Sequence, residues 1–412
     1  MSRPGRSAFP AVLADQMTAD THSLSMPHER VSLMRDPRTR GLIIQIAMII
    51  AILAFAAWLI NNTIQNLTDA RIASGFGFLQ SRAGFDIGQV PIDYTANSSY
   101  GRALLVGITN TVIVAASGIV LATIVGFIIG VGRLSRNYLV RGLSTVYIET
   151  FRNIPPLLVI LFWYFGVLSV LPLPRNAIEL PLGAYISNRG LQTPAAIFEP
   201  TALLSLAACV VGIAATFLIA HVNKRRQVQT GERRSMLWPS LGLIIGLPLV
   251  VFAATGFPVS FQLPEATRFN LVGGWQIKPE FLSLFLALSF YTAAFIAEIV
   301  RAGIMAVSKG QTEAASALGL TRRQTLRLVI VPQAFRVIIP PLTSQYLNLT
   351  KNSSLGLAVG YPELVAIGST VLNQTGQSVE VVAIWMVAYL GLSILTAAFM
   401  NWFNARMALV ER

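Results

Sequence analysis

The sequence is poor in the residues on which most catalytic and metal-binding sites depend. Only 12% of its 412 residues are charged, and it contains three histidines and one cysteine. Because Cys209 is alone, no intrachain disulfide can form, and its apolar surroundings indicate a small core residue. The histidines are not grouped with cysteine or acidic residues at metal-ligand spacing. We therefore expect no metal site.

The motifs of several enzyme classes are also missing. The sequence has no G-x-x-x-x-G-K-[ST] phosphate loop, no nucleophile elbow and no HExxH pair. We therefore expect a chain that is not an enzyme, has no ATPase site of its own and needs no cofactor.

Apolar residues, by contrast, are abundant. They make up 54% of the chain, and the mean hydropathy is +0.63. A membrane-crossing helix needs about 20 mostly apolar residues. We expect an all-α polytopic membrane protein of about eight transmembrane helices, because eight stretches fit: 41–60, 104–132, 145–170, 200–221, 237–257, 282–306, 333–357 and 381–403.

The formal charge is +13, yet the positions of the basic residues argue against a nucleic-acid partner. They lie in short stretches flanking the apolar spans, as the positive-inside rule expects of a protein in a lipid bilayer. If the N-terminus is inside, most basic residues fall on the inner side of the membrane. We therefore expect both termini, and the segment 309–332, to be cytoplasmic.

The segments outside the spans differ in composition. Residues 1–40 and 406–412 are expected to be cytoplasmic tails, the first mostly disordered and followed by an anchor that is retained, not cleaved. The outer segments 61–103, 171–199 and 258–281 are rich in Pro, Gly, Asn and aromatic residues. There we expect short amphipathic helices and caps at the outer face.

The segment 309–332 is polar and helix-forming. We expect a helix over 309–318, a break at Gly319 and a second helix over 322–331. Ser308 with Gln311, and Thr321 with Gln324, have the spacing of a capping box. Gly319 suits a helix C-terminus, and Pro332 suits the first turn of the next helix. A helical pair between two spans is typical of a docking element for a soluble partner.

Two Glu–Arg pairs lie at the ends of spans, where charges are expensive. Glu149 with Arg152, and Glu298 with Arg301, are three residues apart and share a helix face. They either line the inner vestibule or gate of a transport pathway, or form ion pairs that lock helix packing near the cytoplasmic interface.

Span 333–357 is irregular. Pro340 and Pro341 must kink it or set its true start, and residues 350–354 form a polar break deep inside it. Four residues of this break offer a cation with amide and hydroxyl donors, which suits a carboxylate ligand: Lys351, Asn352, Ser353 and Ser354. The alternative is a lysine that snorkels to the outer headgroups.

The spacing in 309–332 resembles that of a known element. Glu313-Ala314-Ala315, three residues, Gly319, nine residues and then Val329 to Pro332 is similar to the EAA loop of ABC-importer permease subunits. That loop reads E-A-A, three residues, G, nine residues, I-x-L-P, and valine here keeps the apolar face. Further stretches resemble the polar amino-acid branch (histidine, glutamine, glutamate or arginine importers): 151–157, 291–311, 332–336 and 351–355.

The resemblance implies a type I importer core of five spans, in two parts, 104–170 and 282–405. The first span, 41–60, the segment 61–103 and the insertion 171–281 with two extra helices are additional. This enlarged layout is similar to the permeases of general L-amino-acid importers of the Aap and Bzt type. The resemblance implies a bacterial inner-membrane subunit that pairs with a second permease, ATPase subunits and a periplasmic binding protein.

The resemblance also implies which residues couple to the ATPase: Gly310, Glu313, Ala314, Ala315, Gly319, Arg322, Arg323 and Pro332. Ala314, Ala315 and Ala317 leave a low surface for a groove, and the arginines can meet acidic groups at its rim. Ion-coupled secondary transport is the main alternative, but Glu149 and Glu298 lie near the inner ends of their spans. The EAA spacing argues against an exporter-type permease or a scaffold.

Overall fold

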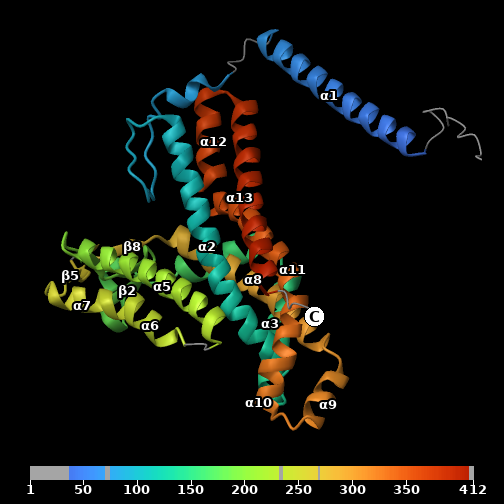
Figure 1. Cartoon of the computed structure of the whole chain (residues 1–412). Helices are drawn as coiled ribbons and strands as arrows, with labels where there is room; N and C mark the ends of the chain where they lie inside the picture. The colour runs from blue at the N-terminus through green and yellow to red at the C-terminus, as the bar shows by residue number, and fades with distance from the viewer. Residues whose placement is uncertain (1–36, 70–74, 232–234, 268–269, 408–412) are drawn as a thin grey trace, which may run out of the picture. The chain divides into compact units, whose positions relative to one another are not determined.

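The computed structural model in Figure 1 describes residues 37–69, 75–231, 235–267 and 270–407. Most of the expected N-terminal tail, and residues 408–412, lie outside the described residues. Helix α1 (Pro37–Asp69) contains the expected first span and belongs to a unit of its own. Residues Arg40–Asn66 of this helix are apolar over a length sufficient to cross a membrane.

The remaining described helices form the second unit. Including α1, seven described helices are long and apolar enough to cross a membrane, or eight if one bent pair counts as a span. This agrees with the expected number. The other long helices are α2 (Tyr100–Arg133), α5 (Ala202–Thr230), α8 (Pro279–Met305), α11 (Val331–Asn352) and α13 (Ser378–Met407).

Helix α8 is the centre of the bundle. It packs along α2 and against α11, and α11 in turn packs against α13 (Figure 1). Small residues allow the closest approach: a Cβ on Gly126 of α2 would stand 2.6 Å from Ile296 of α8, and one on Gly130 would stand 2.6 Å from the Ala297 carbonyl oxygen. Glycine at such positions brings helix backbones together in membranes.

The expected span 145–170 is not one straight helix. The chain forms α3 (Tyr138–Asn153), then α4 (Pro156–Leu161) continuing into the π-helical segment η2 (Phe162–Leu168), with a bend of 110° between the two parts. The cause is Pro155-Pro156. A residue before proline is driven out of the helical region, and both Ile154 and Pro155 are extended, with ψ of 133° and 138°.

The outer segments contain short helices, but they also contain strands that the sequence did not predict. The insertion carries antiparallel strands. One sheet has the order β1-β2-β3-β8, and β4 pairs with β5 and β6 with β7. The bounds are β1 (Ile178–Leu180), β2 (Ala184–Ser187), β3 (Gly190–Thr193), β4 (Ala195–Phe198), β5 (Val259–Gln262), β6 (Glu265–Ala266), β7 (Leu271–Val272) and β8 (Trp275–Ile277).

Three short 3-10 helices complete the described part of these segments: η1 (Phe76–Gln80), η3 (Pro174–Asn176) and η4 (Pro181–Gly183). The β2–β3 hairpin needs glycine. Gly190 has φ of 101°, and a Cβ there would clash with the backbone of Ile277 in β8. The chain is therefore a mainly helical protein with small sheets.

The insertion also contains the two extra apolar helical segments. Helix α5 packs against α6 (Leu237–Leu241), the π-helical segment η5 (Gly242–Gly246) and α7 (Leu247–Ala254). A Cβ on Gly212 of α5 would overlap the Leu243 carbonyl of η5, so glycine is required at this crossing. The strand β3 packs against α8 and connects the insertion to the bundle.

In the C-terminal part of the chain, one helix continues across Pro340 and Pro341. After α9 (Lys309–Ala317), α10 (Arg322–Thr325) runs through the π-helical segment η6 (Leu326–Ile330) into α11, which includes Pro340 and Pro341. The predicted second short helix, 322–331, therefore does not end before Pro332. The polar break is confirmed, because α11 ends at Asn352 and changes to the 3-10 helix η7 (Ser353–Val359), followed by α12 (Leu364–Thr375).

Candidate functional site

Arg133 connects three helices at one end of the bundle. It is the last residue of α2, and its guanidinium forms ion pairs with Glu298 of α8 and with Glu149 of α3, 3.3 Å from Oε1. Because α8 packs against both α2 and α3, the three charges meet where the helices converge. We call these residues, with Arg301, the charge cluster.

Glu298 is the fixed centre of the charge cluster. Arg301, one turn further along α8, places Nε 3.1 Å from Oε1 and 3.0 Å from Oε2 of this carboxylate. The side chains of Arg133 and Glu298 are 20% and 24% exposed, whereas that of Glu149 is 54% exposed. Exposed ion pairs contribute at most about 1 kcal/mol, so the link between Arg133 and Glu149 is the weak one.

Of the two expected Glu–Arg pairs, one forms and the other does not. Glu298 and Arg301 pair as the spacing predicts. In the described part of the chain, Glu149 pairs with Arg133 and not with Arg152. The Arg152 guanidinium instead lies 5.7 Å from the ring centroid of Phe295 on α8, a cation–π contact. Residues three apart on a helix can make contact, but Glu149 and Arg152 each contact a residue of a neighbouring helix instead.

The polar break separates the four candidate ligand residues. Lys351 and Ser354 line an open cavity of about 340 Å³ together with Val365 and with Trp385, Met386 and Tyr389 of α13. Asn352 and Ser353 do not line it. Ser353 is fully buried and donates to the Thr350 carbonyl oxygen over 2.7 Å. Only Lys351 and Ser354 are therefore placed for a ligand in this cavity.

A buried polar network behind this cavity was not predicted. Glu363 is fully buried and caps α12, accepting from the backbone N–H groups of Val365 and Ala366 at 2.8 Å. Tyr389 donates to the same carboxylate over 3.1 Å. Because Tyr389 also lines the cavity, this network positions one of its walls. An acid directly before an apolar helix was the only signal in the sequence.

Hydrogen bonds between buried polar groups also hold the start of α12 against α2. Asn110 Nδ2 donates to the Pro362 carbonyl oxygen over 2.9 Å, and Tyr361 donates to the Asn110 carbonyl oxygen over 3.0 Å. The Leu364 N–H donates to Thr111 Oγ1 over 3.2 Å. Buried polar groups that are bonded in this way fix one arrangement of the elements.

The segment 309–332 forms an exposed helical hairpin at the Arg133 end of the bundle, and we call it the α9–α10 hairpin (Figure 1). Gly319 has φ of 75°, and the Leu320 N–H donates to the Ala315 carbonyl oxygen over 3.1 Å. This is a Schellman motif, which favours glycine. The expected first helix and its break are therefore confirmed.

The two predicted capping boxes differ. At Thr321 the box is complete: the Gln324 N–H donates to Thr321 Oγ1 over 3.4 Å, and the Thr321 N–H donates to Gln324 Oε1 over 2.8 Å. Ser308 occupies the N-cap of α9, but its side chain forms no capping hydrogen bond. Gln311 is instead bonded to Gln333, which donates to its Oε1 over 3.1 Å.

The alanine surface of the α9–α10 hairpin is smaller than expected. Ala314 is exposed, but Ala315 is buried within the hairpin, at 3% exposure. The exposed residues that remain for a partner include Gly310, Glu313, Arg322 and Arg323, while Pro332 lies in the first turn of α11. Leu318, at the tip, is 81% exposed. The hairpin therefore presents charged residues on both arms and one exposed leucine at its tip.

A cavity of about 490 Å³ opens between the arms of the hairpin. It is lined by Thr312 and Ser316 from α9, by Arg322 and Thr325 from α10, and by Arg136 from the turn after α2. The hairpin therefore shares a wall with the turn that connects α2 to α3. Among the described residues there is no group of three or more His, Cys, Asp or Glu side chains that could hold a metal.

Comparison with known proteins places these features in a family. The family described as "Binding-protein-dependent transport system inner membrane component" matches residues 118–409. The chain is 58% identical over 381 residues to the "General L-amino acid transport system permease protein AapQ" of Rhizobium johnstonii, a match that covers 92% of this chain and 95% of that protein.

Two further relatives match over the same share of the chain. The "Putative amino-acid ABC transporter permease protein YhdX" of Escherichia coli K12 is 49% identical, over 92% of this chain and 96% of its own. The "Glutamate/glutamine/aspartate/asparagine transport system permease protein BztB" of Rhodobacter capsulatus is 42% identical, again over 92% and 96%. All three relatives therefore match well beyond the five-span core, which indicates the same enlarged layout.

Proposed function

Because this chain belongs to the family of binding-protein-dependent transport system inner membrane components, we propose that it is the membrane-spanning permease subunit of an ABC importer that carries L-amino acids across the bacterial inner membrane. The energy comes from ATP hydrolysed by separate subunits. The ion-coupled alternative has no support in the relatives.

The α9–α10 hairpin carries this proposal. It combines the EAA spacing with exposed charges and an exposed Leu318 at one end of the bundle. The basic residues favour the cytoplasm for this end and for both termini. We assign the hairpin to a groove of an ATPase subunit, with Glu313, Ala314, Arg322 and Arg323 on the docking surface and Gly319 setting the angle between the arms.

The assembly needs further partners. A second, different permease subunit completes the pathway, because one chain provides only half of an alternating-access route between two membrane subunits. A periplasmic amino-acid-binding protein delivers the substrate to the strand-rich outer segments. The substrate carboxylate meets Lys351 and Ser354, whose cavity is lined on the other side by α13. The Lys351 ammonium suits a carboxylate, and the Ser354 hydroxyl, which donates to the Lys351 carbonyl oxygen over 2.8 Å, would have to turn to join it.

The charge cluster serves as the inner gate in this proposal. Glu298 is held from both sides, whereas Glu149 is half-exposed and held by one contact to Arg133. An exposed pair of this kind breaks at little cost. Parting of α3 from α2 would therefore release Glu149 while the Arg133–Glu298–Arg301 core stays together.

Substitution of Gly319 tests the coupling role. Gly319→Val forces a β-branched residue to φ of 75°, a strain of about 1–2 kcal/mol, and should lower both uptake and transport-stimulated ATP hydrolysis by roughly tenfold. Gly376→Val is the matched control, because Gly376 has φ of 71° in equally open space but caps α12. Unchanged uptake and ATPase stimulation in a normally assembled Gly319→Val complex would refute the proposal.

The partners and substrates are tested separately. The complex is purified through this chain and its subunits are identified by mass spectrometry, and uptake of a panel of labelled amino acids follows. We expect an ATPase, a second permease and a binding protein to co-purify, with uptake abolished by ATP depletion. Uptake that follows a proton or sodium gradient and ignores ATP would favour the ion-coupled alternative.

A further inference from the structure

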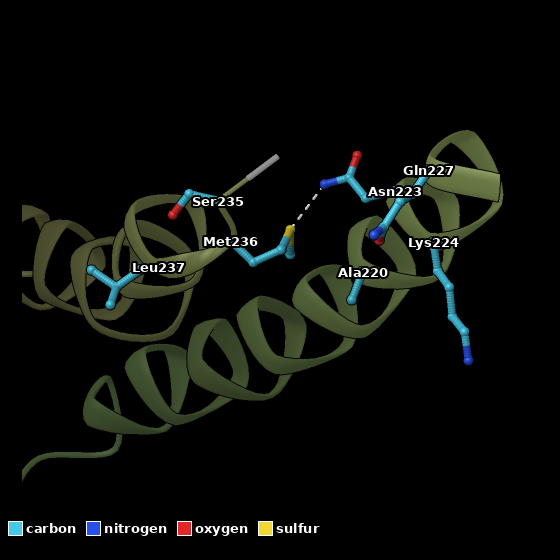
Figure 2. A pocket seen from close by; sticks show the side chains of 7 residues that line it. All are labelled: Ala220, Asn223, Lys224, Gln227, Ser235, Met236 and Leu237. Atoms are coloured by element: carbon cyan, nitrogen blue, oxygen red, sulfur yellow. Dashed lines mark hydrogen bonds between the residues drawn. The ribbon is translucent and has the colours of Figure 1, made fainter. Parts of the chain in front are cut away.

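The insertion carries a cavity that the transport mechanism does not use. It has a volume of about 500 Å³ and lies between the Thr230 end of α5 and the start of α6 (Figure 2). One wall consists of Ala220, Asn223, Lys224 and Gln227, which are spaced to share a face of α5. The opposite wall consists of Ser235, Met236 and Leu237. We call this cavity the α5–α6 pocket.

The α5–α6 pocket is rich in hydrogen-bond donors that lack a strong partner. Asn223 Nδ2 points across the pocket to the Met236 sulfur, 3.0 Å away, as the dashed line in Figure 2 shows. A thioether is a weak acceptor, so this amide can be redirected to an oxygen at little cost. Ser235 and Gln227 are exposed and add further donors.

Positive charge surrounds the α5–α6 pocket. Lys224 lines it, although its ammonium extends away from Asn223 and Met236 in Figure 2. Arg225 and Arg226 follow on the exposed last turns of α5. The positive-inside rule accounts for basic residues here, but it does not account for a donor-lined cavity beside them.

The residues around the α5–α6 pocket place it at the edge of the hydrocarbon layer. Trp238, next to the pocket on α6, is 77% exposed, and exposed tryptophan is typical of the headgroup level. Phe217 is one turn before Ala220 on the same face of α5 and is 73% exposed. Leu237 and Leu241 present an exposed apolar edge on α6. The site is therefore polar at one end and apolar along its length.

We propose that the α5–α6 pocket binds the phosphate headgroup of an anionic phospholipid. The donors of Asn223, Gln227 and Ser235 bond the phosphate oxygens, and Lys224, Arg225 and Arg226 supply charge complementarity. The acyl chains lie along Phe217 and Leu241. Basic pockets between transmembrane helices on the cytoplasmic side bind such headgroups. A soluble phosphate ester has the same headgroup chemistry but would not use the apolar surface.

Native mass spectrometry of the full-length chain, with its co-purifying subunits, tests the proposal. The complex is released from vesicles that contain phosphatidylglycerol and phosphatidylcholine, and the lipids that remain bound are counted. We expect phosphatidylglycerol to be retained preferentially. Lys224→Gln should weaken this retention about fivefold, because one basic residue near an anionic surface contributes about that factor. Asn223→Leu, which leaves the net charge unchanged, should also reduce it.

Arg175→Gln is the matched control, because it removes one exposed positive charge from the same insertion but away from the pocket. It should retain the lipid as the unsubstituted chain does. Equal retention of the two lipids, or equal loss in Lys224→Gln and Arg175→Gln, would overturn the proposal. So would displacement of the lipid by glycerol 1-phosphate alone, because that would identify a soluble phosphate as the ligand.

Discussion

Arg133, and not Arg152, is the cation that reaches Glu149, with 3.3 Å between the guanidinium and the carboxylate. The two residues lie on different helices, α2 and α3, and Arg133 also contacts Glu298 of α8. The contact between α2 and α3 is therefore electrostatically linked to α8. A movement of α3 relative to α2 would therefore change the pairing of Arg133, which also contacts Glu298 of α8.

A double-mutant cycle tests this relationship. Arg133→Gln and Glu149→Gln should each lower uptake, and the double variant should lower it by less than the product of the single effects. The expected coupling is about 1 kcal/mol or less, roughly fivefold in rate, because Glu149 is half-exposed. Uptake is measured in reconstituted vesicles and divided by the amount of assembled complex.

A second double-mutant cycle, of Glu149→Gln with Arg152→Gln, is the control. Because these two residues do not pair, their single effects on uptake should be additive. A larger coupling in this control than in the Arg133 cycle would contradict the assignment. If all variants lose only abundance in the membrane and keep their uptake per complex, the charge cluster acts in helix packing and not in the gate.

Alanine substitutions at the two N-caps of the α9–α10 hairpin, Thr321 and Ser308, should differ in their effect on helix stability. Thr321→Ala removes the side-chain oxygen that accepts from the Gln324 N–H, one half of a complete capping box, and should destabilise α10 by about 1 kcal/mol. Ser308→Ala should have little effect, because Ser308 makes no side-chain capping bond. Amide hydrogen exchange over residues 309–330 measures both. Equal exchange rates in the two variants would show that the capping box does not hold this arm.

Lys351 is expected to act on substrate affinity. Lys351→Ala should raise the KM for uptake by roughly tenfold or more, because a charged hydrogen bond to a carboxylate contributes about 1.5–3 kcal/mol. Lys351→Arg should recover part of the loss. Assembly with the partner subunits should be normal in both, since the lysine side chain is exposed to the cavity.

Ser353→Ala is the matched control for Lys351. Its hydroxyl bonds to the Thr350 carbonyl oxygen in the core, so its loss should affect the stability of the complex and leave KM unchanged. If Lys351→Ala has an unchanged KM for every transported amino acid, Lys351 is not part of the substrate site.

Gly368 of α12 is expected to be essential for packing. A Cβ there would overlap the indole ring of Trp385 on α13, reaching 2.7 Å from Cε2. Gly368→Ala should lower the thermal stability of the purified chain by about 1–3 kcal/mol, the usual cost of overpacking. Gly391→Ala, on the same α13 with open space around it, should have no such cost. Similar melting temperatures for the two variants would contradict this packing.

The features that could be predicted from the sequence are those with local causes. The break at Gly319 follows from the need for a positive φ, and the helix before it from the polar, Ala-rich segment. The spans follow from hydropathy, since lipid selects apolar helices whatever their neighbours. The polar break after Thr350 was likewise visible as a change in composition within one segment.

The features that could not be predicted depend on contacts between distant segments. The partner of Glu149 is 16 residues away on another helix, and the role of Asn110 depends on Pro362, 252 residues later. Ala315 was expected on a surface but is covered by the second arm of its own hairpin. The strands of the insertion are only two to four residues long, too short for an alternating pattern to identify.

The helical path from Arg322 to Asn352 has a mechanical consequence. At about 1.5 Å per residue it is roughly 45 Å long, with the docking surface at one end and Lys351 at the other. The π-helical segment η6 and the double proline at 340 and 341 lie within this path, at the kinds of position where helices bend most readily. A tilt of about 5° along this length would move the far end by about 4 Å, comparable to the diameter of an amino-acid side chain.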